Sequence, residues 1–245
     1  MSRIALLLPT SSYRATDFIA AAKALDVDVV VACDRRQALS RVMGDRALTL
    51  PLSRPEQAAS ALVAHAQRLR LDAIVAVDDQ GVEVAALAAT RLGLPHNPPQ
   101  VAALTRDKAA LRRALVGRVP QPDFLVVGPD DDVAAAAAEV GPPVVMKPVS
   151  LSASRGVIRA DDPEQAVGAA ARIRHILACA NTDPRAPLLV ERYVAGAEVA
   201  VEGLLRGGRL EVLAVFDKPD PLEGPYFEET LYVTPSRLPS HVVEQ

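Results

Sequence analysis

The stretch PPVVMKPVSLSASRGVIRADD, from Pro142 to Asp162, holds two short apolar runs separated by a loop of small polar residues. Runs of this length and composition predict two β-strands. The first predicted strand ends in Lys147, and Gly156 precedes the second. Lysine is scarce in this chain, whose other lysines are Lys23, Lys108 and Lys218. A scarce residue at a strand end before such a loop makes Lys147 a candidate for a specific role.

The residues of this loop are compatible with phosphate binding. The hydroxyls of Ser150, Ser152 and Ser154 and the backbone N–H groups around Gly156 can surround a phosphate, while the ammonium of Lys147 supplies positive charge. The P-loop pattern GxxxxGK[ST] occurs nowhere in the chain. A hairpin loop of small residues beside a solvent-reaching lysine would give the same pattern. From these residues alone, both interpretations stay open.

The length, composition and charge of the whole chain exclude some classes of function. Its 245 residues, half of them hydrophobic, allow one large domain or two smaller ones. The net charge is -3 and no basic stripe is present, so we expect no nucleic-acid partner. The first apolar run is too short for a signal peptide or a membrane span, which predicts a cytoplasmic protein. Cys33 and Cys179 lie in apolar runs, and we expect both to be buried free thiols.

In the first third of the chain, apolar strands alternate with amphipathic helices. This rhythm predicts a parallel sheet covered by helices on both faces. The first strand-to-helix turn lacks the GxGxxG pattern, which disfavours a dinucleotide site. The expected strands are 4–8, 27–34, 47–52 and 71–79; the expected helices are 16–25, capped by Thr16 or Asp17, then 55–70 and 81–91.

The pattern changes after the proline-rich stretch at residues 93–99. One helix is expected over 99–115, and the strands that follow are expected to pair antiparallel, as in an α+β domain. The expected strands are 123–128, 142–148, 156–162, 187–194, a hairpin over 198–218 turning at 206–209, and 226–235. The expected helices are 131–140, a long helix to residue 180 capped by Asp162 and Pro163, and one turn from residue 239.

A second stretch, LLVERYVAGAEVAVEG, places Glu191 near the end of an apolar strand and Glu198 shortly after it. The connector between them offers backbone groups to an adenine edge. Taken in order, RDK at 106–108, VVMKPVSLSASRGV, this stretch and FDKPDPLEGPYFEETLYVTPSRLP resemble the ATP-grasp superfamily, specifically the carboxylate–amine ligases that include the amino-acid (dipeptide) ligases. The resemblance covers essentially the whole chain and rests on the ordered set of motifs.

The resemblance implies an α/β fold. It implies a Rossmann-like parallel-sheet preATP-grasp domain at 1–95, a linker helix at 96–118, the N-terminal lobe of an α+β ATP-grasp domain at 119–190, and the start of its C-terminal lobe at 191–245. ATP is the implied nucleotide. By position, Lys108 and Lys147 match two phosphate-contacting lysines, the stretch from Ser150 to Gly156 matches a mobile loop, Glu191 and Val194 match a hinge whose backbone reads adenine, and Glu198 matches a ribose-binding carboxylate.

The implied reaction activates a carboxylate as an acyl-phosphate, which an amine then attacks. The substrates are therefore a small-molecule carboxylate and an amine, with amino acids as the expected class. Lys218, Glu228 and Glu229 match the region near the acyl acceptor, although a solvated strand edge would look the same. The resemblance identifies no catalytic residue beyond these candidates.

Magnesium is the implied metal, and in the family its ligands come from a later strand. No such stretch follows Tyr232, so the resemblance implies a catalytic domain without its metal ligands in this chain. A carboxylase-like or purine-pathway ATP-grasp enzyme and a non-catalytic nucleotide-binding protein stay open as alternatives, and so does a homodimer.

Other candidates for a site are weaker. Asp78 and Asp79 end a predicted strand and are expected to cap the next helix, or else to line a cleft. The histidines, at positions 65, 96, 175 and 241, show no metal-ligand spacing.

Overall fold

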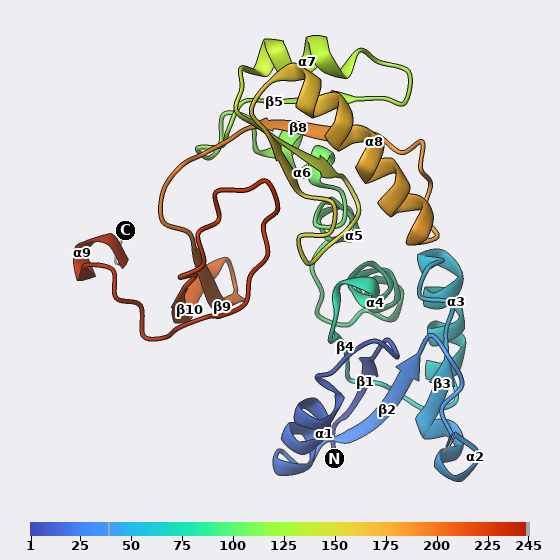
Figure 1. Ribbon diagram of the computed structural model, residues 1–245. Helices are drawn as coiled ribbons and strands as arrows, with labels where there is room; N and C mark the ends of the chain where they lie inside the picture. Colours follow the sequence, from blue (N-terminus) through green and yellow to red (C-terminus); the bar gives the residue numbers. More distant parts are fainter. Residues whose placement is uncertain (39, 244–245) are drawn as a thin grey trace. The chain divides into compact units, whose positions relative to one another are not determined.

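The computed structural model describes residues 1–38 and 40–243, and the chain divides into two compact units, Met1–Asp107 and Lys108–Gln245 (Figure 1). The boundary falls inside the single helix expected over 99–115. That expectation is wrong, because two helices are present: α5 (Pro99–Leu104) in the first unit and α6 (Lys108–Leu115) in the second. At the break, the hydroxyl of Thr105 donates to the carbonyl of Ala102, a local bond of the kind that competes with helix continuation.

The first unit is built on a parallel sheet. Its strands are β1 (Arg3–Leu7), β2 (Asp28–Cys33), β3 (Ala47–Thr49) and β4 (Ala73–Ala76), in the order β3-β2-β1-β4. Its helices are α1 (Ala15–Ala24), α2 (Ser40–Met43), the 3-10 helix η1 (Gly44–Arg46), α3 (Pro55–Ala66), α4 (Asp79–Leu92) and α5.

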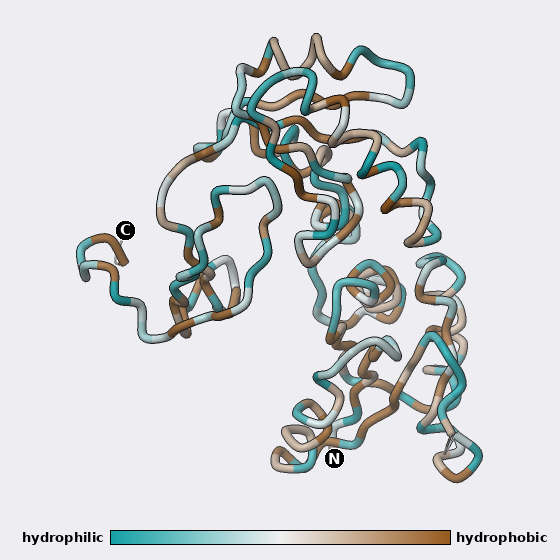
Figure 2. Tube along the Cα trace, viewed as in Figure 1, coloured by the Kyte–Doolittle hydropathy of each residue, from teal (hydrophilic) through white to brown (hydrophobic). Residues whose placement is uncertain are grey.

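Side chains alternate between the two faces of this sheet. Ala5 and Leu7 are buried in a core formed with α3 and α4, whereas Leu6 and Leu8 belong to a cluster on the α1 side. The strands are hydrophobic along their length because both faces are covered (Figure 2). The expected parallel sheet covered on both faces is confirmed.

Helix α3 begins at Pro55 as expected, but two other helix starts in this unit differ from expectation. Helix α1 begins at Ala15 with Arg14 in the capping position and no side-chain cap, so the expected cap at Thr16 or Asp17 is wrong. Asp78 occupies the capping position of α4, yet its side chain accepts no capping hydrogen bond. Asp79 instead forms a 3.0 Å ion pair with Arg106.

The second unit contains an antiparallel sheet. Its strands are β5 (Phe124–Val127), β8 (Leu188–Arg192), β6 (Val144–Pro148) and β7 (Ile158–Ala160), adjacent in that order. Helices α7 (Val133–Val140) and α8 (Pro163–Cys179) cover one face, where Val144, Met146 and Val190 are buried (Figure 1). Ala109 of the short helix α6 packs on the other face, against Val149 and Leu189.

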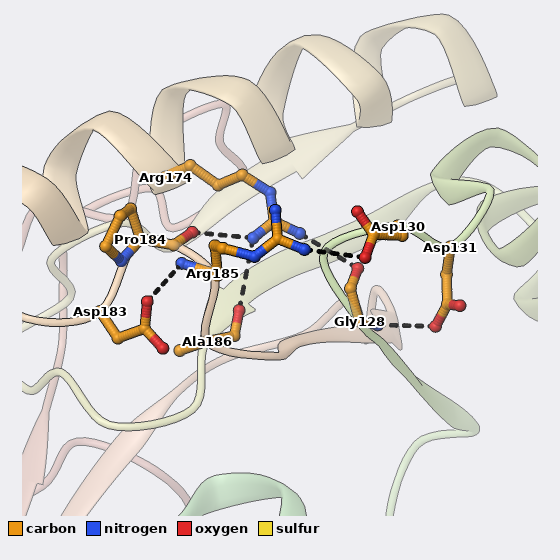
Figure 3. Close-up of polar contacts among 8 residues, drawn as sticks. All are labelled: Gly128, Asp130, Asp131, Arg174, Asp183, Pro184, Arg185 and Ala186. Carbon is orange, nitrogen blue, oxygen red and sulfur yellow. Dashed lines mark hydrogen bonds and ion pairs between the residues drawn. The ribbon is translucent and has the colours of Figure 1, made fainter.

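The loops at one end of this sheet are held by Arg174 of α8 (Figure 3). Its guanidinium donates to the carbonyl oxygens of Gly128, Pro184 and Ala186, which lie in the loops after β5 and before β8. Arg185 adds an exposed 2.8 Å ion pair to Asp130. One half-buried helix side chain thus fixes both loops to the core.

The exposure of Cys179 differs from expectation. Cys33 is buried, but Cys179 is exposed, so the expectation of two buried thiols is wrong for the second. Cys179 follows the buried Leu177 by two residues, which turns its side chain about 200° around α8 from the core-facing stripe.

The rest of the second unit is a hairpin and an irregular segment. Strands β9 (Val199–Arg206) and β10 (Arg209–Asp217) pair antiparallel, as predicted, and α9 (Ser240–Val243) is the expected single turn. The strand expected over 226–235 is wrong: only two isolated bridges form, at Tyr226 and Val233. The carboxylate of Asp220 binds the backbone N–H groups of Thr230 and Leu231, which takes donors that a strand would need.

No helix of the described residues is both long and apolar enough to cross a membrane.

The predicted cap of α8 is confirmed and allows a stability test. Asp162 accepts a 2.8 Å hydrogen bond from the backbone N–H of Gln165, whose side chain in turn accepts from Asp161. Asp162→Ala should lower the free energy of unfolding by about 1 kcal/mol, because that N–H loses its partner. Asp162→Asn, which can still accept the bond, should stay near wild type in thermal unfolding. Equal losses in both variants would contradict the assignment of the cap.

Candidate functional site

Lys147 and Glu191 lie on the α6 face of the second sheet. Lys147 on β6 pairs in register with Leu189 on β8, two residues before Glu191. Because side chains alternate along strands, Lys147 and Glu191 are diagonal neighbours on one face. Their ammonium and carboxylate form an ion pair. Lys147, at the end of β6, is therefore ion-paired with a glutamate on the adjacent strand β8.

A third charge, from helix α6, completes this cluster. The Nε of Arg112 donates to Oε1 of Glu191, while Lys147 binds Oε2. Only 3% of the Glu191 side chain is exposed, against 21% for Lys147 and 27% for Arg112. Burial alone would raise the pKa of Glu191, but the hydrogen bond from Arg112 and the charge of Lys147 outweigh it and hold the pKa below its ordinary value. Glu191 is thus a buried carboxylate between two cations.

The lowered pKa of Glu191 predicts how stability depends on pH. A carboxyl whose pKa is lower in the folded state stabilises the fold above its unfolded pKa, near 4.5, and that contribution is lost as the pH falls through the folded pKa. Urea unfolding should therefore show a stability difference between wild type and Glu191→Gln that is steady near neutral pH and shrinks below about pH 4. A difference independent of pH would contradict the ion pairs.

The loop after β6 is attached to helix α6. Lys108 donates its backbone N–H to the carbonyl of Val149 and its ammonium to the carbonyl of Leu151. Ser150, between these two carbonyls, and Ser152, after them, are both exposed. Among the described residues, the backbone N–H groups at positions 152–154 have no hydrogen-bond partner. The loop therefore presents free donors close to Lys108.

This loop is also strained. Ala153 and Ser154 adopt positive φ angles of 56° and 52°, which residues with a side chain rarely occupy. Gly156 has φ of 75°, and a Cβ there would lie 3.3 Å from the Pro148 side chain. A side chain at position 156 would therefore crowd the end of β6.

A cavity of about 880 Å³ lies next to the loop. Its walls come from the loop, from helix α8 and from the irregular segment after β10. The residues that line it are Ala153, Ser154, Arg155, Gly156, Val157, Ile158, Arg172, Ile176, Lys218, Tyr226, Phe227, Glu228, Glu229 and Tyr232. A space of this size fits a small organic ligand.

Lys218 is the cation most tightly held in the cavity wall. Its ammonium binds Glu198, which directly precedes β9, and donates to Glu229 at 2.8 Å. Burial alone would lower the pKa of Lys218, but these two acids outweigh it and raise the pKa. The hydroxyl of Tyr232 donates to the other oxygen of Glu229. The expected substrate-side residues Lys218 and Glu229 thus form one ion-paired group, and Glu228 lines the cavity beside them.

The segment carrying these acids is bound to β7. Arg159 donates its side chain to the carbonyl of Glu223 at 2.7 Å and its backbone N–H to that of Pro225. Gly224 has φ of 99°, and a Cβ there would lie 2.8 Å from Cβ of Arg159. Arg172 of α8 stacks its guanidinium on the ring of Tyr226, 5.0 Å from the ring centre. These contacts define one wall of the cavity.

The predicted residues thus fall into four places. Lys147 and Glu191 join the charge cluster, and Lys108 holds the loop. Ser154, Gly156, Lys218, Glu228 and Glu229 line the cavity. Val194 is 67% exposed in the connector between β8 and β9.

The predictions missed Arg112, Arg172, Tyr226 and Tyr232. A signal existed for Arg112, because it follows Lys108 by four residues on a helix and so shares its face.

The resemblance implied a hinge at Glu191 and Val194. In the structure Glu191 lies inside the central strand β8, and its side chain faces Arg112 and Lys147. The free connector begins after Tyr193, whose N–H still bonds to the carbonyl of Pro143. The backbone groups free of the sheet are therefore those after Tyr193, around Val194.

Two family models match the chain. A model described as ATP-grasp N-terminal domain matches residues 19–96, and one described as ATP-grasp domain matches residues 140–245. The chain belongs to the ATP-grasp superfamily. The second match contains the loop, the charge cluster residues on β6 and β8, and all the lining residues of the cavity.

Relatives and solved structures agree with this membership. The alanine–anticapsin ligase of Bacillus amyloliquefaciens is 29% identical over 159 residues, which are 57% of this chain and 32% of that protein. The L-amino acid ligase of Bacillus licheniformis has a TM-score of 0.78 at 20% identity, over 100% of this chain and 57% of that one. An N5-carboxyaminoimidazole ribonucleotide synthetase in complex with ADP has a TM-score of 0.74 at 14% identity, over 99% of this chain and 60% of that one. The chain therefore spans less than two thirds of the length of each of these proteins.

Metal ligands were not expected within this chain. Over residues 1–38 and 40–243, no group of three or more His, Cys, Asp or Glu side chains is arranged to hold a metal ion. His65 is buried, with its Nε2 lacking a hydrogen-bond partner, whereas the other three histidines are exposed.

Proposed function

We propose that this ATP-grasp chain binds ATP in its second unit, as part of an ATP-dependent carboxylate–amine ligase of the cytoplasm. The observation that carries the proposal is the strand end and loop around Lys147, where cationic side chains and unbonded backbone N–H groups lie together. Lys108 and Lys147 would contact phosphates, and the loop from Ser150 to Gly156 would cover them. The connector around Val194 would read adenine, and Glu198 would bind ribose.

The chemistry of the site suits this role. The three charges of Arg112, Lys147 and Glu191 sum to one positive charge, which favours an anion. Phosphoryl transfer depends mostly on positioning and on neutralising charge. A loop that closes over the phosphates also keeps water away from a reactive acyl-phosphate. Magnesium would neutralise further phosphate charge when bound, but we assign it no residue of this chain.

The reaction that we propose has two steps. An oxygen of the carboxylate substrate attacks the γ-phosphorus of ATP, which forms an acyl-phosphate and releases ADP. The amine nitrogen then attacks the acyl carbon, phosphate leaves, and the amine loses a proton. We propose the cavity beside Lys218, Glu228 and Glu229 for the amine substrate, because a carboxylate there can hold an ammonium. The relatives that carry amino-acid ligase names favour amino acids as both substrates.

The acyl-phosphate gives the sharpest test of this function. The protein is incubated with ATP, magnesium, single amino acids and hydroxylamine, which converts an acyl-phosphate into a hydroxamate. We expect a hydroxamate that depends on both ATP and an amino acid. ADP release that requires bicarbonate instead would indicate the carboxylase-like alternative. Tight ATP binding without turnover on any carboxylate would indicate a non-catalytic nucleotide-binding protein.

A further inference from the structure

Glu191 binds two cations, and only one of them belongs to the proposed phosphate site. Lys147 extends from the end of β6, next to the loop. Arg112 comes from helix α6 and occupies the opposite oxygen of the same carboxylate. The residue that reaches the loop from α6 is Lys108, one turn earlier on the same helix face. Among the described residues, the side chain of Arg112 forms its hydrogen bond and ion pair with Glu191 alone.

The effect of Arg112 follows from charge balance. With Arg112 present, the buried carboxylate is shared, and the cluster keeps one positive charge for an incoming phosphate. Without Arg112, Glu191 and Lys147 would form a neutral pair, because Lys147 would be the only cation bound to the carboxylate. An ammonium held in such a closed pair attracts a phosphate less, because the nearby negative charge cancels its field.

We propose that Arg112 is a positioning residue of the nucleotide site: it neutralises Glu191 and so keeps the charge of Lys147 available to a phosphate group of ATP. This inference rests on the proposed function, in which Lys147 contacts that phosphate. Arg112 acts through Glu191 and does not touch the nucleotide.

The test compares ATP affinities of four forms of the chain by calorimetric titration. Arg112→Ala should bind ATP about tenfold more weakly than wild type, a change of about 1.4 kcal/mol. The control is Arg113→Ala, which removes one charge from the same helix. The side chain of Arg113 is exposed and forms no hydrogen bond or ion pair with any described residue, so this variant should match wild type within about threefold.

A double variant separates positioning from a structural role. Arg112→Ala with Glu191→Gln removes one positive and one negative charge, so the cluster again carries one net positive charge. The amide oxygen that Glu191→Gln introduces can still accept a hydrogen bond from Lys147. We therefore expect the double variant to regain affinity within about threefold of wild type. If Arg112 mattered only by packing α6 onto the sheet, the second substitution would restore nothing.

The outcomes distinguish this inference from the proposed function. Wild-type affinity in Arg112→Ala, or a double variant as weak as the single one, overturns the role of Arg112 and leaves the ATP site standing. A wild-type chain that binds no ATP overturns both. Where Arg112→Ala does not fold, the double variant and Arg112→Lys decide: both retain one net positive charge, so both should bind ATP within about threefold of wild type, and weaker binding overturns the inference.

Discussion

Glu191→Ala should lower the free energy of unfolding of the second unit by about 3 kcal/mol, because it leaves two partly buried cations facing each other without their carboxylate. Removing one partner of a buried ion pair costs about 3–5 kcal/mol. The lower value applies here, since Arg112 and Lys147 each keep about a quarter of their side chains exposed to water. Urea unfolding at neutral pH measures the loss.

Glu198→Ala is the matched control for this prediction. Glu198 also pairs with a lysine, Lys218, but half of its side chain is exposed. Exposed ion pairs contribute about 0–1 kcal/mol, so this variant should unfold close to wild type. Equal stability losses in the two variants would contradict the view that Glu191 holds the charge cluster together.

Much of the fold was predictable from periodicity. Short apolar runs bounded by glycine and proline marked the strands, and the capping pattern that begins at Asp162 marked the start of α8. Two of the failures share a cause: a side chain took a backbone donor or acceptor that regular structure would have used. Thr105 did so between α5 and α6, and Asp220 did so in the segment expected as a strand. Such bonds depend on where individual side chains lie, which the hydrophobic periodicity of a sequence does not specify.

The candidate site was predictable in part. Lys147 and the loop could be identified because the strand end and the small polar residues are contiguous. The cluster around Glu191 could not, because Arg112 lies 79 residues away in sequence and their contact follows from how α6 packs on the sheet. Two signals were present: a glutamate inside an apolar strand must find cationic partners if it is buried, and Arg112 follows Lys108 by four residues on one helix face. Neither signal pairs Arg112 with Glu191.

Lys147→Ala should weaken ATP binding about ten- to a hundredfold. The substitution removes a charged hydrogen bond of about 1.5–3 kcal/mol to the nucleotide. It also leaves Glu191 paired with Arg112 alone, which lowers the net charge of the cluster from one positive charge to zero. Calorimetric titration with ATP measures the affinity, and circular dichroism establishes that the variant is folded.

Lys23→Ala is the control for this variant. Lys23 is an exposed lysine on helix α1 in the first unit, and its side chain has no partner among the described residues. Its removal changes the net charge of the chain equally but should leave ATP affinity within about twofold of wild type. A matching loss in both variants would mean that ATP responds to overall charge rather than to the end of β6.

The most direct measurement is a calorimetric titration of wild-type chain and Lys147→Ala with ATP, each with and without magnesium. We expect saturable binding by wild type that is weakened about tenfold or more in the variant and that changes little with magnesium. Equal ATP affinity in the two proteins, or no binding by wild type in either condition, would contradict the placement of the nucleotide site at the end of β6.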